Sequence, residues 1–389
     1  MIQNWISEIR ALTSEGMFAF IALTSAMCIT GTTLLSPALP SIAKGISVGS
    51  SQIGLIITAY TLPAIFVLPI SGYLADNLGR DKVMAIGCFL VGLGGLAGFF
   101  ATNLYQLVFV RVLQGIGIAG VMPTTVTLIG DLYSGSKEAS AQGLRGTSNK
   151  IGSISWSLIG GILAGMTWNY VFLVYIIFIP LGLFAYFKVP SGKVENREPL
   201  KYLKGMKSVV ERPKIAGLLF LGFNRMFIKY AVITYIPIML KSRYSLAAAA
   251  IGGFMALRGV TGAVSSSTAG LFDQKFGKKI TITAAFATIA LTNLLLATTD
   301  SITIVVLMLA SYGLMDSLFS ALHKTILSQS IEEKHRAGLM TSNSLAQKLG
   351  ATAAPLLIGA ALFLQNEIYL YFITFISILS VLAFLLIEE

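Results

Sequence analysis

The chain alternates long apolar runs with short polar segments. Windows of about 19 residues, the length used to detect membrane helices, predict twelve spans in this sequence. They lie at residues 17–36, 51–71, 83–101, 106–130, 140–165, 169–188, 215–240, 248–271, 280–298, 302–327, 338–363 and 369–387. The pattern predicts an all-α membrane protein of twelve transmembrane helices.

Composition agrees with the bilayer as the solvent of this chain. Of 389 residues, 55% are hydrophobic and 12% are charged. A single water-soluble globule cannot bury that much apolar surface. Because a span needs about 20 residues, a chain of this length accommodates twelve spans only if its loops are short, as they are here.

The positive charges fall mainly on one side of the predicted membrane topology. The net charge of +11 would favour nucleic-acid binding in a soluble protein. With both termini inside, however, the cytoplasmic segments hold seventeen Lys and Arg residues, and the outer segments hold only Lys44, Lys241 and Arg243. By the positive-inside rule, we expect a multi-pass protein of the inner (plasma) membrane with cytoplasmic termini and no nucleic-acid partner. MIQNWISEIRALTSEG lacks the basic start and cleavage site of a signal peptide, so the first helix should be retained.

The longest polar stretch divides the twelve spans into two sets of six. We expect an N-terminal half at 1–188, a cytoplasmic linker at 189–214 and a C-terminal half at 215–389. Within the linker, apolar residues at helical spacing are consistent with a short helix lying on the inner leaflet, and a solvated basic linker is equally consistent. These residues are Leu200, Leu203, Met206 and Val210.

An internal repeat relates the two halves. A shift of 198 residues aligns Gly72 and Gly79 with Gly270 and Gly277, and the same shift aligns Lys150 with Lys348. Two parallel six-helix repeats, with the substrate site between them near the bilayer midplane, characterise one large class of transporters. The repeat therefore predicts two pseudo-symmetric six-helix bundles.

The loop after the second span, GYLADNLGRDK, resembles the cytoplasmic signature of the major facilitator superfamily. The resemblance extends over essentially the whole chain. It implies a cytoplasmic gate that holds the outward-facing state closed, with Asp76 near a helix N-terminus of the second half and Arg80 near Asp131. The gate residues would be Gly72, Asp76, Gly79, Arg80 and Asp131. The alternative is a solvated charged turn that only sets topology.

Spans four and five resemble the drug/proton antiporters of that superfamily, the second of them incompletely. Arg111 begins the span-four sequence RVLQGIG, and the resemblance implies that this arginine is linked to proton movement. Span five has glycines at 143, 152, 160 and 161, as the antiporter motif requires. Trp156 and Ser157 stand where that motif has Gly-Pro. Loss of the proline removes an expected kink. The incomplete motif therefore supports proton exchange less strongly than the cytoplasmic signature supports the fold.

Eight basic residues lie inside spans, against one acidic residue, Asp316. A charge at the bilayer centre costs at least about 2.5–3.5 kcal/mol, so these groups should face a wet cavity with partners. One aspartate cannot neutralise several cations, which favours an organic anion carrying carboxylate or phosphate as the substrate. The predicted binding residues are Lys150, Lys348, Arg225, Lys229, Arg258, Trp156 and Tyr230.

Each of these assignments has a structural alternative. Arg258 and Asp316 could form a static ion pair, Arg111 could be structural, and Trp156 and Tyr230 could serve in packing. The pairing of Arg258 with Lys348 is also similar to the arrangement in dicarboxylate exchangers of the superfamily. Asp316 and Arg111 are the predicted coupling residues, with Asp316 responding to substrate or to Arg258.

Catalytic and metal-binding patterns are absent from the sequence. Cys28 and Cys88 stand alone in apolar runs, and His323 and His335 lack ligand spacing. We therefore expect neither an enzyme nor a bound metal or cofactor. The leading interpretation is a monomeric secondary transporter that exports an organic anion by alternating access with proton coupling. The alternatives are multidrug efflux of neutral or cationic compounds by proton antiport, and an organic-anion exchanger or importer.

Overall fold

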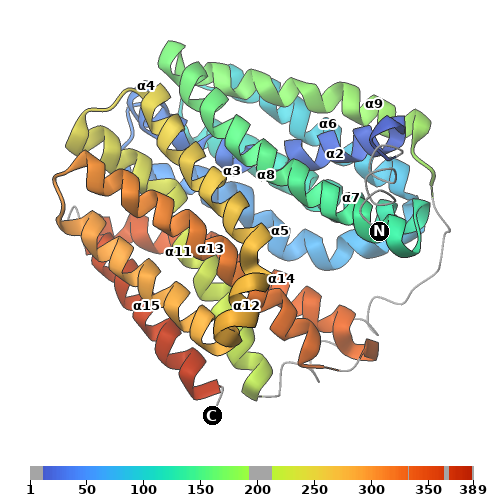
Figure 1. The fold of residues 1–389 in the computed structure, drawn as a ribbon. Coiled ribbons are helices and arrows are strands. Elements are labelled where there is room, and N and C mark those ends of the chain that lie inside the picture. Colours follow the sequence, from blue (N-terminus) through green and yellow to red (C-terminus); the bar gives the residue numbers. More distant parts are fainter. Residues whose placement is uncertain (1–11, 192–212, 332, 363–367, 388–389) are drawn as a thin grey trace.

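A computed structural model describes residues 12–191, 213–331, 333–362 and 368–387, and all its regular elements are helices (Figure 1). Those before the linker are α2 (Gly16–Cys28), α3 (Thr30–Thr33), η1 (Ser36–Ala38), α4 (Leu39–Gly45), α5 (Ser50–Leu78), α6 (Arg80–Phe99), α7 (Leu104–Leu132), α8 (Gly135–Met166), η2 (Trp168–Ile177) and α9 (Phe178–Lys188). Those after it are α11 (Pro213–Tyr244), α12 (Ala248–Thr298), α13 (Ile302–Gln329), α14 (Glu333–Leu362) and α15 (Ile368–Ile387).

The twelve-helix architecture predicted from the apolar pattern is confirmed. Within the described residues, nine helical segments are long and apolar enough to cross a membrane. One of them, α12, has 51 residues and bends at Gly277 (φ 74°, ψ 162°), so it contains two predicted spans. The other two spans are α8, which is too polar to qualify by composition, and α15, which is shorter.

The first span is interrupted rather than continuous. Helix α2 ends at Cys28, and α3, η1 and α4 continue the crossing to Gly45. Pro37 and Pro40 lie in the last two of these segments, where proline prevents regular helix hydrogen bonding. Irregular backbone at membrane depth persists only where protein buries it, and residues 30–39 are all buried. The break exposes backbone carbonyls to other side chains of the core.

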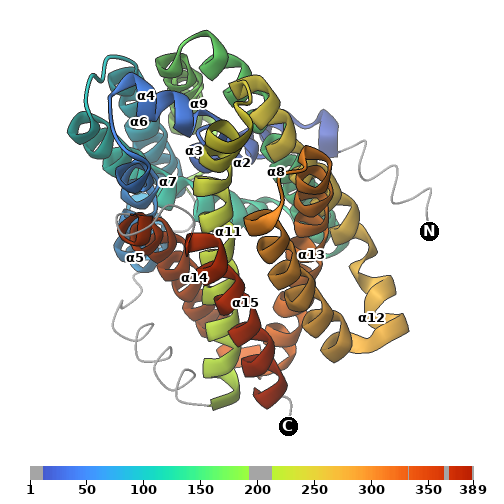
Figure 2. The same cartoon turned by 90° about the vertical axis from the view of Figure 1, so that its left-hand side faces the viewer.

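Two separate hydrophobic cores hold the helices together. One consists of buried residues between Leu12 and Val189, and the other of residues between Ile215 and Phe384. Tyr230 and Ile238 of α11 pack against both cores. Helix α11 runs through the middle of the view in Figure 2. The predicted linker 189–214 and its apolar positions Leu200, Leu203, Met206 and Val210 lie outside the described residues over 192–212.

The helix ends define two sides of the molecule. On the Gly79 side lie the turns at Gly79, Ser134 and Gly277, and Lys278 Nζ donates to Gln329 Oε1 at the end of α13. On the Gly49 side lie the turns at Gly49, Thr167, Ala247 and Thr299, where Tyr244 donates a hydrogen bond to the Thr299 carbonyl. The Gly79 side is the one that the charge distribution predicts to be cytoplasmic.

The halves are joined closely towards the Gly49 side. Helix α8 meets α12 where Gly161 faces Gly252, so closely that a Cβ on Gly161 would lie 2.6 Å from the Ala248 carbonyl oxygen. Helix α5 meets α14 in the same way, and the Thr352 hydroxyl donates to Thr61 Oγ1 at 2.9 Å. Small residues allow such close backbone approach between membrane helices. These two close contacts, or seams, join the halves nearer to the Gly49 side than to the Gly79 side.

Candidate functional site

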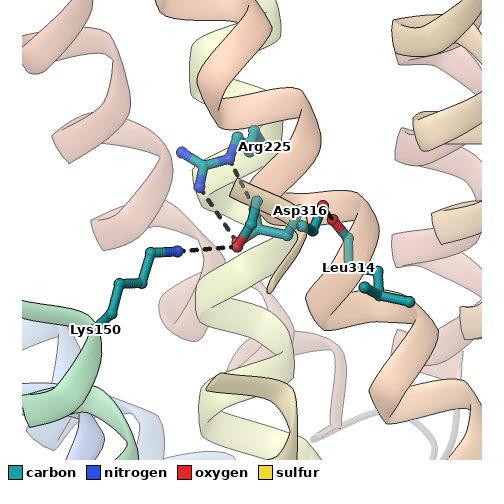
Figure 3. Close-up of polar contacts among 6 residues, drawn as sticks. Lys150, Arg225, Leu314 and Asp316 are labelled. Atoms are coloured by element: carbon teal, nitrogen blue, oxygen red, sulfur yellow. Dashed lines mark hydrogen bonds and ion pairs between the residues drawn. The ribbon is translucent and has the colours of Figure 1, made fainter. Parts of the chain in front are cut away.

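The centre of the molecule contains a buried ion pair between α11 and α13. Arg225 Nε lies 2.7 Å from Asp316 Oδ1, and Arg225 Nη2 lies 3.3 Å from Asp316 Oδ2 (Figure 3). The two side chains are only 8% and 10% exposed. A bidentate carboxylate–guanidinium pair is among the strongest charge-assisted contacts. The direct ion-pair partner of Asp316 is thus Arg225, and the alternative of a static Arg258–Asp316 pair does not describe this contact.

Lys150 reaches this pair from the other half of the molecule. It lies on α8, and its Nζ donates to Ser317 Oγ on α13 at 3.1 Å (Figure 3). Its charged neighbours are Asp316, Arg225 and Arg258. The contact joins the two halves at mid-depth, because Lys150 is near the middle of the 32-residue helix α8.

Two more cations complete the cluster. Lys229 lies one helical turn after Arg225 on α11. The charged groups around it are the carboxylate of Asp316 and the cations Arg225, Arg258 and Lys150. Arg258 on α12 is 8% exposed, and its Nε has no hydrogen-bond partner among the described residues. The central cluster thus consists of Lys150, Arg225, Lys229 and Arg258 around the single carboxylate of Asp316.

Lys348 lies half-buried on α14, and Cys28 of α2 is an ionisable group close to it. Lys150 donates to Ser317 on α13. Among the described residues, Lys348 shares no hydrogen bond or ion pair with Lys150 or Arg258. The joint action of Lys150 and Lys348 from the two halves, and the pairing of Arg258 with Lys348, stay predictions.

The two predicted aromatic residues make packing contacts as well as lining the interior. Trp156 donates its indole N–H to the Ala26 carbonyl at 2.8 Å, which fixes α8 against α2. Tyr230 interacts with the Thr32 side chain and packs against both hydrophobic cores. Tyr230 is therefore placed where movement of one half against the other changes its surroundings.

Arg111 lies in a different network, wholly inside the N-terminal half. It is 0% exposed, and its guanidinium donates to the Gly31 carbonyl, to the Ile56 carbonyl at 3.3 Å and to Gln114 Oε1 at 2.8 Å. It also lies 4.0 Å from the centroid of the Tyr60 ring. The interrupted first span supplies the Gly31 acceptor. This arrangement fits the structural alternative for Arg111, because neutral groups satisfy the charge without a carboxylate.

The predicted gate lies at the Gly79 side. Arg80 forms an ion pair with Asp131, as the motif resemblance implied, and its Nη1 lies 3.4 Å from the Thr127 carbonyl. Gly79 has φ 97°, a conformation that favours glycine, and so turns the chain between α5 and α6. A Cβ on Gly72 would meet no atom within 4 Å, so no close helix approach occurs at that glycine in the described structure.

Two features were not predicted from the sequence. One is the contact of Lys150 with Ser317, and the other is a pocket between α13 and α14 that Lys324 helps to line. Ser317 follows Asp316 directly, and Lys324 lies seven residues later, on the same face of α13. That spacing was available as a signal. Without the tertiary structure, however, a serine and a lysine near a helix end resemble ordinary surface residues.

A twelve-helix membrane protein whose two halves meet around a charged cluster at mid-depth has the architecture of a membrane transporter. The sequence pattern of the Major Facilitator Superfamily matches residues 21–270 and 218–389, and the chain belongs to this superfamily.

Similar proteins support the same assignment. The chain is 32% identical over 272 residues to the "Bacillibactin exporter" of Bacillus subtilis (strain 168), covering 66% of this chain and 67% of that protein. It is 33% identical over 161 residues to "Multidrug transporter protein MdtP" of the same organism, covering 41% and 29%, respectively. The fold is similar to a crystal structure of "nucleoside transporter NupG", with TM-score 0.80, 13% identity and coverage of 96% and 100%. These are transporters of small molecules, and the chain is a transporter, not an enzyme.

Proposed function

We propose that this chain is a secondary transporter that exports an organic anion by alternating access, coupled to protons. The anion carries a carboxylate or phosphate group and can be amphipathic. In this proposal the protein lies in the inner (plasma) membrane with both termini in the cytoplasm, because the Lys and Arg residues are concentrated on the Gly79 side.

The surplus of positive charge in the central cluster carries the proposal. Asp316 already accepts two hydrogen bonds from Arg225. Lys150 has only a neutral hydroxyl as its direct partner, and the Arg258 Nε has none among the described residues. Buried charges are costly unless they are paired. An anionic substrate would supply the missing counter-charge.

Asp316 is the candidate for proton coupling because it is the only acidic residue within the spans. An anion bound by the neighbouring cations would compete with Asp316 for Arg225. Repulsion between the two negative charges would favour protonation of the aspartate. Substrate and proton would then influence each other's binding by the same coupling free energy.

The direction of transport is proposed from two observations. The printed name of one relative says that it is an exporter, and span four carries the antiporter-like sequence RVLQGIG. The export direction rests on these two observations. The close contacts between the halves at Gly161 and at Thr352 lie towards the outer side in the predicted orientation.

Thermal unfolding of the purified chain tests the substrate class. We expect an anion such as salicylate or glucose 6-phosphate to raise the melting temperature, since a ligand that binds only the folded state stabilises it. Tetraphenylphosphonium, a lipophilic cation, should have no such effect. The Arg258→Gln variant should lose the anion response, and Lys44→Gln, a change at an exposed lysine near the Gly49 side, should keep it.

Multidrug efflux is the second candidate, favoured by the printed name of MdtP. It predicts the opposite pattern, in which the lipophilic cation stabilises the protein and the anions do not. Such a result would exclude the anion proposal without affecting the assignment to the superfamily.

A further inference from the structure

Helices α13 and α14 form an open pocket with several polar side chains at the Gly79 side, outside the central cluster. Its volume is about 540 Å³. Besides Thr325 and Met340, its lining residues are Lys324, Ser328, Asn343, Ser344 and Gln347. We refer to it as the α13–α14 pocket. It lies within a few helical turns of Gln329, where α13 ends.

The pocket contains polar groups whose bonding capacity the protein does not use. The Lys324 side chain is exposed and forms no ion pair with the rest of the described chain. Asn343 is 5% exposed, and its buried Oδ1 has no hydrogen-bond partner among the described residues. This oxygen faces Gly222 of α11, where a Cβ would lie 2.6 Å from it. The groups that a ligand in the pocket can reach are the exposed Lys324 and Ser344 and the half-buried Ser328 and Gln347.

The chemistry of the lining indicates the kind of ligand. Lys324 supplies one positive charge, and the amide side chains of Asn343 and Gln347 offer both donors and acceptors. The hydroxyls of Ser328 and Ser344 donate to the backbone of their own helices, to Thr325 O at 2.9 Å and Met340 O at 2.8 Å, and so keep acceptor positions for a ligand. This set suits one anionic group attached to a polar, hydrogen-bonding body.

The α13–α14 pocket and the central cluster share one face of α13. Ser317, which accepts the hydrogen bond from Lys150, lies seven residues before Lys324 and eleven before Ser328. At 3.6 residues per turn, both spacings return to within about 20° of the same direction. Lys324 lies within electrostatic reach of Arg225, Arg145 and Lys150. Positive charge therefore continues from the pocket to the central cluster.

We propose that the α13–α14 pocket is a docking subsite on the Gly79 side, where the organic anion binds before it moves to the central cluster. The inference rests on the proposed function for the substrate class, but its site is separate. An anion that enters the pocket replaces part of its hydration shell by contacts with Lys324 and the amides of the lining. When it moves on, it replaces those contacts by contacts with the cations of the central cluster. Staged replacement of hydration avoids a single large desolvation step.

Thiol labelling tests the charge selectivity of the pocket without knowledge of the substrate. Ser344→Cys introduces an exposed thiol, whereas the native Cys28 and Cys88 are buried. Reaction rates are compared for anionic ethylsulfonate and cationic trimethylammonium-ethyl methanethiosulfonates. The Lys324 charge should favour the anionic reagent about fivefold. Lys324→Gln should reduce this preference severalfold and Lys324→Arg should keep it. Equal rates for both reagents in the Ser344→Cys protein overturn the proposal.

Protection experiments then test whether the pocket binds an anion independently of the central cluster. Salicylate and glucose 6-phosphate are used as probes against labelling of Ser344→Cys, in the parent protein and with Lys150→Gln. At least one probe should slow labelling in both backgrounds, and neither should do so with Lys324→Gln. If neither probe protects the parent, the ligand class is wrong. If protection disappears with Lys150→Gln, the pocket is no separate subsite, although the proposed function would stand. A third outcome would reject the central site instead. In that outcome a probe still slows labelling of Ser344→Cys, but neither probe raises the melting temperature of the parent protein above that of Arg258→Gln.

A lipid headgroup could satisfy the same chemistry, so the labelling is repeated in nanodiscs. Discs of phosphatidylcholine alone are compared with discs that also contain phosphatidylglycerol. Equal labelling rates support docking of a soluble anion. Slower labelling with phosphatidylglycerol, in the absence of either probe, means that a lipid occupies the pocket and overturns the proposal.

Discussion

Arg225 and Asp316 lie 91 positions apart in the sequence and form the central bidentate ion pair, with contacts of 2.7 and 3.3 Å between α11 and α13. The pair uses the only carboxylate in the spans, so the other cations of the central cluster must be balanced in another way. Its two helices both belong to the C-terminal half. Protonation of Asp316 would release Arg225 without breaking a contact between the halves.

Asp316→Asn should abolish pH-driven transport and spare exchange of substrate. The amide cannot titrate, and Arg225 then remains available to an anion throughout the cycle. Transport of an anion that passes the thermal test is measured in proteoliposomes, with a pH gradient and as counterflow without one. Asp316→Glu, which keeps a carboxylate, is the control. Full pH-driven accumulation by Asp316→Asn would refute coupling through this residue.

Lys150→Gln should weaken anion binding roughly tenfold or more, because a hydrogen bond to a charged group contributes about 1.5–3 kcal/mol. Titration calorimetry gives the dissociation constant. Ser317→Ala, which removes only the hydroxyl that Lys150 contacts, should have a smaller effect. Unchanged affinity in Lys150→Gln would exclude this lysine from the site.

Lys348→Gln should act independently of Lys150→Gln. If the two lysines acted as one clamp, the double variant would lose little more binding free energy than either single variant. Among the described residues, Lys150 donates to Ser317 and shares no hydrogen-bond or ion-pair partner with Lys348, and changes at sites without shared partners usually add. We therefore expect the free-energy changes of binding to sum in the double variant. Strong non-additivity would restore the clamp.

Arg80→Ala should impair transport and leave membrane insertion intact, and we expect the same of Asp76→Asn. Arg80 joins the start of α6 to the end of α7 through Asp131, far from the central cluster. An exposed ion pair contributes at most about 1 kcal/mol to stability, so the protein should still fold. Transport rates are compared with cysteine accessibility on the two sides of the membrane. Rates and accessibility like those of the parent in both variants would reduce the motif to a role in topology.

Gly161→Ala should open the interface on the Gly49 side. The new Cβ would lie 2.6 Å from the Ala248 carbonyl oxygen and 2.9 Å from Gly252 Cα. Overpacking costs about 1–3 kcal/mol, so labelling of a buried Thr352→Cys on the other seam should accelerate about fivefold or more. Gly165→Ala, where a Cβ meets nothing within 4 Å, is the matched control. An unchanged labelling rate of Thr352→Cys would mean that only the α8–α12 seam loosens. That result would contradict the idea that each half moves as a rigid unit.

Acid should release the start of α2 from the Gly79 end of α8. Glu15 accepts hydrogen bonds from Lys137 Nζ at 2.9 Å and from Tyr133 Oη at 2.7 Å. These contacts lower the pKa of Glu15 from its usual 4.5, and burial together with Glu15 raises the pKa of Tyr133, so the hydroxyl remains a donor at neutral pH. A depressed carboxyl pKa stabilises the fold above the unfolded pKa. The stabilisation is lost as the pH falls below about 4.5 and through the folded pKa.

Hydrogen exchange at the first turns of α2 measures this release. Protection should fall over that acid range in the parent protein, by an amount typical of an exposed pair, about 0.5 kcal/mol. Glu15→Gln should show the lower protection already at neutral pH and no further fall in that range. A parent profile that does not change with pH would argue against this contact.

The number and approximate limits of the spans followed from the sequence alone, because the hydrocarbon thickness acts on every crossing segment through local composition. Once the spans are assigned, the charged residues inside them can be counted in the sequence without knowledge of their neighbours. The surplus of cations over the single carboxylate could therefore be predicted as well. The sharp turns at Gly79 and Gly277 were also indicated by the motif and by its repeat.

Tertiary structure alone decided which of those charges meet. Asp316 pairs with Arg225 and not with Arg258, and Lys150 reaches Ser317 while Lys348 lies near Cys28. The α13–α14 pocket likewise combines residues of two helices. Such contacts depend on the rotation and depth of one helix relative to another. Close packing at residues such as Gly161, Gly252 and Gly313 sets these quantities, and neither hydropathy nor the repeat spacing encodes them.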